Sequence, residues 1–108
     1  MYSFPLEEQE RILKKGLANA YCDKEAYHGA LYLTNDRLVF VGYILDISRK
    51  FLQEIPLTHI REINPAKTFG IIPNVIKVVT IKGFHIKFIL SSRDEWLKAI
   101  KEQIIRIG

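Results

Sequence analysis

The sequence contains a single cysteine and no apolar run long enough to cross a membrane. Cys22 alone cannot form an internal disulfide or a cysteine-rich zinc site, which is compatible with a reducing compartment. A membrane-spanning helix needs about 20 predominantly apolar residues, and the first four residues lack the apolar core of a signal peptide. We therefore expect a cytoplasmic protein.

Residues that usually indicate catalysis are also sparse. The three histidines fall in separate parts of the chain, at His28, His59 and His85. The sequence has neither a phosphate-cradling glycine loop nor a nucleophile elbow. Cys22 has no evident activating partner, so we expect a buried, inert thiol. We predict that the protein is not an enzyme and that it holds no cofactor and no metal.

Neither sign of charge dominates the composition. Sixteen basic and twelve acidic residues give a net charge of +4, and 48% of the residues are hydrophobic. A chain of 108 residues fits a single domain, residues 1–108, around one core. The modest positive charge favours anionic surfaces weakly. Nucleic-acid binding is not expected, because basic and aromatic residues do not interleave on one face.

Residues 29–40, GALYLTNDRLVF, form the most informative stretch and predict a β-hairpin. Two apolar runs flank Asn35 and Asp36, whose side chains tolerate the left-handed conformations that a two-residue turn requires. This turn fixes the pairing of the two strands, so that four apolar side chains share the face expected to meet the core. These side chains are Leu31 and Leu33 on one strand, facing Phe40 and Leu38 on the other.

Further apolar and branched runs predict strands at about residues 11–22, 51–56, 60–63, 75–80 and 84–90. Residues 5–10 suit the first turn of a short helix, and residues 67–74 predict a loop. Residues 43–50 leave a loop and a strand extension as alternatives. We expect residues 75–90 to form a hairpin with a three-residue loop that ends at a left-handed Gly83. In that register Ile76 and Val78 share a face with Ile86 and Phe88.

The C-terminal residues 92–107 predict an amphipathic helix. Ser92 and Glu95 have the spacing of a capping box, and acidic residues suit the first turn. Apolar residues then recur at spacings of three and four, beginning with Trp96, which we expect to be a core anchor. The chain is therefore predicted to be mainly β, with about seven antiparallel strands in a curled sheet and one C-terminal α-helix covering an open end.

Several of these segments resemble one family. GALYLTNDRLVF is similar to the signature of GRAM domains, in which a glycine precedes an L-Y-L-T-N-x-R-L-V-F segment. IPLTHI at 55–60 and RDEW at 93–96 are similar to later parts of that family's pattern. The resemblance implies the pleckstrin-homology-like (PH-like) fold, a bent antiparallel barrel of about seven strands capped by one helix. It also implies a non-catalytic binding or adaptor module, because members of the superfamily bind phosphoinositides, other anionic lipids or proteins.

The resemblance suggests a first candidate site for an anion or lipid headgroup. In PH domains the headgroup lies between the loops after strands one, three and six, which correspond here to residues 22–25, 42–50 and 81–84. Their basic residues are Lys24, Arg49, Lys50 and Lys82. The usual basic motif is not matched, because Lys24 is followed by an acid and an alanine. Ordinary solvated loop charges are the alternative explanation of these residues.

A second candidate site lies in the 67–74 loop, where three large apolar side chains, Phe69, Ile71 and Ile72, are close together. If they are exposed, they form a surface for a protein partner or for a homodimer. If the loop folds back, they complete the core. Ile44 and Leu45 raise the same alternatives, and they add the option of dipping into a bilayer. The predicted function is therefore peripheral binding to an anionic phospholipid membrane, with protein interaction as the alternative.

Overall fold

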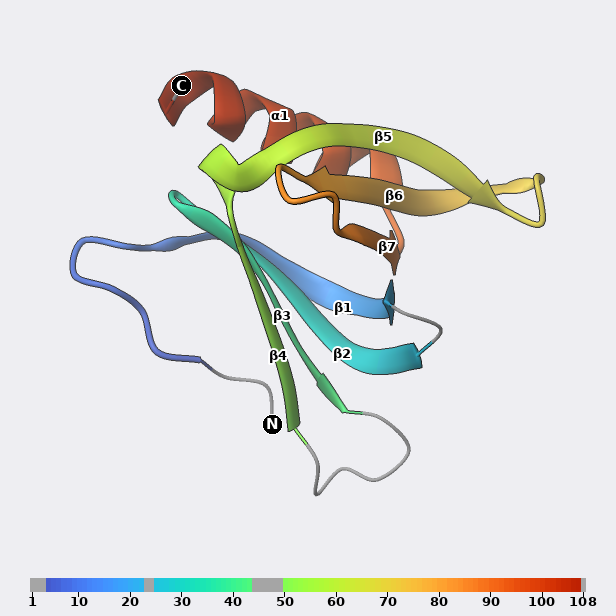
Figure 1. Cartoon of the computed structure of the whole chain (residues 1–108), viewed down its shortest axis with the longest axis horizontal. Coiled ribbons are helices and arrows are strands. Elements are labelled where there is room, and N and C mark those ends of the chain that lie inside the picture. The colour runs from blue at the N-terminus through green and yellow to red at the C-terminus, as the bar shows by residue number, and fades with distance from the viewer. Residues whose placement is uncertain (1–3, 23–24, 44–49, 108) are drawn as a thin grey trace.

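The computed structural model describes residues 4–22, 25–43 and 50–107, apart from the side chains of Tyr43 and Lys50. Within these residues the elements are β1 (Ile12–Cys22), β2 (Glu25–Thr34), β3 (Arg37–Tyr43), β4 (Lys50–Pro56), η1 (Leu57–His59), β5 (Ile60–Thr68), β6 (Ile72–Thr80), β7 (His85–Ile89) and α1 (Arg93–Ile107). The prediction of a mainly β chain with one C-terminal helix is confirmed (Figure 1).

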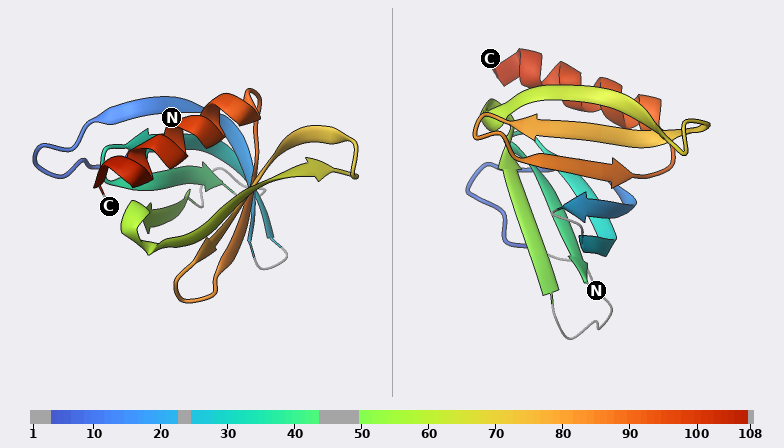
Figure 2. Two further views of the ribbon diagram at one scale, coloured as in Figure 1. Left: turned by 90° about the horizontal axis from the view of Figure 1, so that it is seen from above. Right: turned by 45° about the vertical axis from the view of Figure 1, so that its right-hand side comes forward.

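All seven strands form one antiparallel sheet with the order β4-β3-β2-β1-β7-β6-β5. The sheet curls into a half-barrel, so that β1–β4 make one layer and β5–β7 make the other (Figures 1 and 2). Helix α1 packs against β5, β6 and η1. Its buried residues are Trp96 and Ile100, which confirms the tryptophan as a core anchor. The PH-like architecture expected from the sequence is thus present.

The β2–β3 hairpin has the predicted register. Leu33 lies opposite Leu38, and Leu31 lies opposite Phe40. All four side chains are buried in the main core. The other face of this hairpin is also buried, because Phe4 packs against a second cluster that includes Tyr32, with 5.0 Å between the two ring centroids.

The conformation expected for the turn of this hairpin is wrong. Neither Asn35 nor Asp36 is among the described residues with positive φ. Instead, the hydroxyl of Thr34 accepts hydrogen bonds from the N–H groups of Asp36 (3.1 Å) and Arg37 (2.9 Å). A side chain that satisfies the turn amides in this way replaces the left-handed geometry that we expected.

An ion pair ties this turn to the N-terminal segment. Arg37 donates to the Glu10 carboxylate from Nε (2.7 Å) and Nη2 (2.9 Å), and Thr34 donates to the same group (2.6 Å). The Glu10 side chain is 1% exposed. Arg37 also bonds Glu54 on β4. Asn35 adds a further tie, because its side-chain oxygen accepts the N–H of Arg11 (2.8 Å).

Two segments differ from the prediction. Residues 5–10 form no helix, and a turn there is closed by the N–H of Glu10 donating to the C=O of Glu7 (3.0 Å). β5 continues through Pro65 to Thr68 and β6 begins at Ile72, so most of the expected 67–74 loop is strand. Proline is tolerated in β5 because it is an edge strand of the sheet. Residues 44–49, including Ile44 and Leu45, lie outside the described residues.

The register of the second hairpin is confirmed. Ile76 lies opposite Phe88 and Val78 opposite Ile86, and Gly83 has a φ of 84°. Helix α1 begins one residue later than predicted. Ser92 has a φ of 55°, outside the extended region in which a capping-box serine is normally found.

One close approach within the β2–β3 hairpin requires glycine. Gly29 and Gly42 lie directly opposite each other. A Cβ atom on Gly29 would lie 2.0 Å from the carbonyl oxygen of Val41, and one on Gly42 would lie 2.5 Å from the ring of Phe40. Side chains at these positions would therefore force the strands apart.

The ion pair predicts how stability depends on pH. Hydrogen bonds from Arg37 lower the pKa of Glu10 from 4.5 to about 2, although burial acts in the opposite direction. Because the folded-state pKa lies below the unfolded value, this carboxylate stabilises the fold above about pH 4.5, and the contribution is lost as the pH falls towards 2. We expect Glu10 to account for about 3 kcal/mol of that loss.

Urea unfolding between about pH 7 and pH 2 measures this contribution. Glu10→Gln should lower the free energy of unfolding at neutral pH and flatten its pH dependence, whereas Glu8→Gln, exposed in the same segment, should change neither. If the free energy of unfolding of Glu10→Gln varied with pH in parallel with that of the wild type, Glu10 would not be the source of the pH dependence.

Candidate functional site

Little of the predicted basic site falls within the described residues. Lys24 and Arg49 lie outside them, and only the backbone of Lys50, the first residue of β4, is described. Lys82 is exposed, and it lines an open groove beside the second half of β4 together with Glu54. The convergence of the four basic residues therefore stays a prediction.

The three apolar residues of the second candidate are on the surface. Phe69 is 90% exposed, Ile71 77% and Ile72 49%, so the hypothesis that they complete the core is wrong. They lie at the end of the β5–β6 hairpin, which projects beyond the rest of the sheet (Figures 1 and 2). We call these three residues the apolar tip.

The turn at the apolar tip has an unusual backbone. Phe69 and Gly70 have φ values of 53° and 69°, and the N–H of Ile71 donates to the C=O of Thr68 (3.0 Å). Left-handed φ values suit glycine and asparagine, but they are strained for a bulky residue. An aromatic side chain thus occupies a position where the fold favours a smaller residue. Strain of this kind often accompanies binding sites.

The base of the hairpin is braced on both strands. On β5, the C=O of Ala66 accepts a hydrogen bond from Nη1 of Arg93 (2.8 Å), which connects the strand to α1. On β6, Oδ1 of Asn74 accepts a hydrogen bond from the hydroxyl of Thr68 (2.6 Å). The backbone C=O of Asn74 accepts one from the N–H of Leu90 (3.0 Å). The apolar tip is therefore carried on a base that is held in place by the rest of the fold.

The layer that carries the apolar tip is basic. The sequence contains no acidic residue from 63 to 93, while this stretch includes Lys67, Lys77, Lys82, Lys87 and Arg93. Lys77 and Lys87 lie directly opposite each other on β6 and β7. Like charges in this arrangement repel, so the positive potential of this layer is maintained at a cost in stability.

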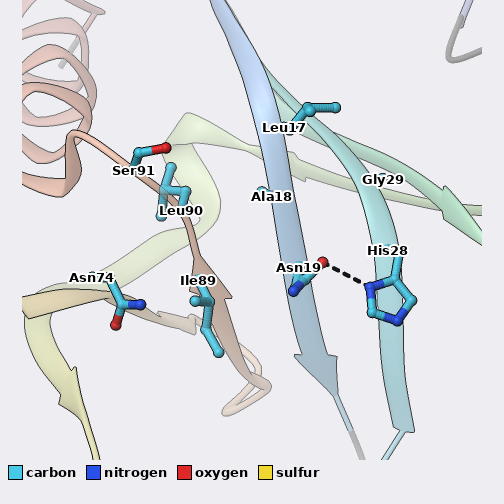
Figure 3. A pocket seen from close by; sticks show the side chains of 9 residues that line it. All are labelled: Leu17, Ala18, Asn19, His28, Gly29, Asn74, Ile89, Leu90 and Ser91. Atoms are coloured by element: carbon cyan, nitrogen blue, oxygen red, sulfur yellow. Dashed lines mark hydrogen bonds between the residues drawn. The ribbon is translucent and has the colours of Figure 1, made fainter. Parts of the chain in front are cut away.

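A groove opens beside this layer where β1 and β7 separate, beyond the last β1–β7 pair, Asn19 and Ile89. Its volume is about 570 Å³, and none of the described residues that line it is acidic. In Figure 3, the side-chain nitrogens of Asn19 and Asn74 are turned towards Ile89 from either side. The lining residues are Leu17, Ala18, Asn19, His28, Gly29, Asn74, Ile89, Leu90 and Ser91.

The residues considered for catalysis do not come together. His28, His59 and His85 lie on β2, η1 and β7, and Cys22 is buried, as predicted. The described part of the chain contains no group of three or more side chains suited to a metal ion. No helix among the described residues has both the length and the hydrophobicity needed to span a bilayer.

The chain is similar to known domains in sequence and structure. A family model described as "GRAM domain" matches residues 1–107. The C-terminal domain of an unknown protein from Leishmania infantum has a TM-score of 0.75 and 22% identity, covering 91% of this chain and 87% of that chain. The Vps36 N-terminal PH domain has a TM-score of 0.73 and 14% identity, and the match covers 95% of this chain and 85% of that chain. At these identities the two structures show the shared fold alone. No curated protein matches this chain in sequence.

The strained turn predicts an unusual effect of mutation. Phe69→Asn should raise the free energy of unfolding by about 0.5–1 kcal/mol, because asparagine tolerates a left-handed φ and the phenylalanine ring is exposed. Ile71 lies in the same turn but has no positive φ. Ile71→Asn should therefore leave the free energy of unfolding within about 0.5 kcal/mol of the wild-type value. Chemical denaturation measures both variants. A loss of stability in Phe69→Asn would mean that the ring is packed in solution.

Proposed function

Because this chain belongs to the GRAM domain family, we propose that it is a binding module that attaches peripherally to anionic membranes. GRAM and other PH-like domains are typically non-catalytic modules that bind lipids or proteins. The observation that carries the proposal is the apolar tip, because Phe69 and Ile71 are almost fully exposed on a projecting hairpin. The proposal locates the protein in the cytoplasm, at a membrane surface.

The charge around the apolar tip favours a membrane over a protein partner. The tip belongs to a stretch with five basic residues and no acidic one, and Lys67 lies two positions before Phe69. Such a surface complements anionic headgroups, while its apolar end matches the acyl boundary below them. A stable protein interface buries about 800 Å² on each partner, which is far more than three side chains at the end of a hairpin provide.

The energies involved are consistent with reversible attachment. Burial of a side chain such as Phe69 or Ile71 contributes about 1.5–3 kcal/mol. Each lysine near an anionic surface adds about 1 kcal/mol, which salt weakens. Stable membrane binding generally requires two such signals together, and this layer provides both. Lys24, Arg49, Lys50 and Lys82 would add to the second signal if they face the same membrane.

Cosedimentation with vesicles tests this function. Wild-type protein should sediment with phosphatidylcholine vesicles that contain phosphatidylserine, and much less with phosphatidylcholine alone or at high salt. The double variant Phe69→Asn and Ile71→Asn should bind at least about tenfold more weakly, since it loses the apolar signal. Ile105→Asn is the matched control, because Ile105 is 78% exposed on α1, and it should bind like the wild type.

Two results would overturn the proposal. The first is equal sedimentation of the double variant and the wild type. The second is a wild-type protein that does not sediment but forms a dimer by light scattering, which the double variant fails to form. That second pattern would assign the apolar tip to self-association.

A further inference from the structure

The groove between β1 and β7 lies next to the apolar tip. Asn74 lines the groove, and it follows Ile72 of the apolar tip by two positions on β6. Two residues of a strand span about 7 Å, and interfacial apolar groups reach about 5–10 Å into the headgroup and acyl boundary. If the tip is inserted as proposed above, the groove therefore lies at the depth of the lipid headgroups.

Two side-chain amide groups in the groove, those of Asn19 and Asn74, have N–H donors that are not used within the described part of the fold. Oδ1 of Asn19 lies 2.9 Å from Nδ1 of His28, and Oδ1 of Asn74 accepts the hydroxyl of Thr68 at 2.6 Å (Figure 3 shows the first of these bonds). Because both oxygens are engaged, each side chain presents its nitrogen to the groove. Neither nitrogen has a hydrogen-bond partner among the residues that the structure describes. The two free amide nitrogens, one on each side of Ile89, are therefore both donors.

Positive charge lies on the two strands next to the groove, although neither lysine there is among the described residues that line it. Lys87 and Ile89 are two positions apart on β7 and therefore lie on the same face of the sheet. Lys77 is directly opposite Lys87, and neither lysine forms an ion pair with another described residue. A bound anion would offset the repulsion between the two ammonium groups. Among the described residues, the groove offers no carboxylate that would repel such an anion.

From these observations we infer that the groove binds a phosphate monoester on the headgroup of a membrane lipid. This inference rests on the proposed function, and it assigns a ligand to the same membrane-facing surface. A phosphate monoester has three acceptor oxygens and nearly two negative charges at neutral pH. Its oxygens can accept hydrogen bonds from the side-chain nitrogens of Asn19 and Asn74, and its charge is attracted by Lys87, two positions before Ile89 on β7. A diester has one charge and fewer free oxygens, so it satisfies fewer of these groups.

The residues involved differ from the basic loops predicted from the sequence. Lys82 is not among the described residues that line this groove, while Lys24, Arg49 and the side chain of Lys50 lie outside the described part of the chain. The predicted site would lie among loops, whereas this one is built on β1, β6 and β7. Its two asparagines are positioned by hydrogen bonds to His28 and Thr68, so their donors are oriented before the ligand arrives.

A soluble probe tests the groove without any membrane. In an NMR titration with glycerol phosphate, the side-chain amide signals of Asn19 and Asn74 should shift. Asn19→Asp and Asn74→Asp keep the oxygen that each neighbour uses but replace the donor with a negative oxygen. Each should weaken binding at least about tenfold. Thr58→Glu, exposed on η1, makes the same change of charge and is the matched control. The backbone amide spectrum shows whether each variant is folded.

Vesicles test the lipid source of the phosphate. At equal surface charge, vesicles with phosphatidic acid, a monoester, should bind the protein more tightly than those with phosphatidylserine, a diester. Asn19→Asp and Asn74→Asp should remove this preference. Equal affinity of the wild type for both lipids would overturn the inference, as would a glycerol phosphate titration that leaves both amide signals unmoved.

The two proposals fail in different ways. The double variant at Phe69 and Ile71 should lose sedimentation with both lipids but keep the glycerol phosphate shifts at Asn19 and Asn74. If the wild type binds both vesicle types equally and neither amide signal shifts, insertion of the apolar tip stands and the phosphate site fails. If the amide signals shift but no vesicle binds, the proposed membrane function fails and the lipid source of the phosphate is overturned with it.

Discussion

The buried ion pair between Arg37 and Glu10 is the interaction on which the rest of the fold depends. It joins three parts of the chain, because Arg37 begins β3, Glu10 precedes β1, and Glu54 on β4 bonds the same guanidinium. Removing one partner of such a pair leaves an uncompensated charge, which typically costs about 3–5 kcal/mol. Because Thr34 and Asn35 also connect the turn to the N-terminal segment, the polar residues of the GRAM-like signature have an architectural role here.

The curled sheet separates this architecture from the surface proposed to bind. The layer β1–β4 contains the ion pair and the second apolar cluster beneath Phe4. The other layer carries the acid-free stretch, the apolar tip and one wall of the groove. The hydrogen bonds of Arg93 and Asn74 join that layer to α1 and to the chain after β7. Exposed apolar and basic residues can therefore be tolerated on this layer, because the opposite face of β6 and β7 is buried in the main core.

Patterns local in the sequence predicted most of the fold. Alternating apolar residues and short turns fixed the register of both hairpins, and helical spacing located α1, because these signals act between near neighbours. What depends on distant partners was missed. The Thr34 hydroxyl that accepts the turn amides also donates to Glu10, 24 positions away. The edge position of β5 allows a strand through Pro65. The direction of the Phe69 side chain and the groove between β1 and β7 arise only from the assembled sheet, so no pattern in the sequence revealed them.

The close approach of Gly29 and Gly42 has a consequence for how this sequence can diverge. Any larger residue at position 29 would collide with a backbone atom, the carbonyl oxygen of Val41, so a change of side-chain conformation cannot relieve the contact. Substitutions at the apolar tip can change what the domain binds without disturbing this contact, whereas any replacement of Gly29 would disturb it whatever the domain binds. A search that relies on the glycine-led signature will recover relatives with the same backbone, and these relatives need share no ligand.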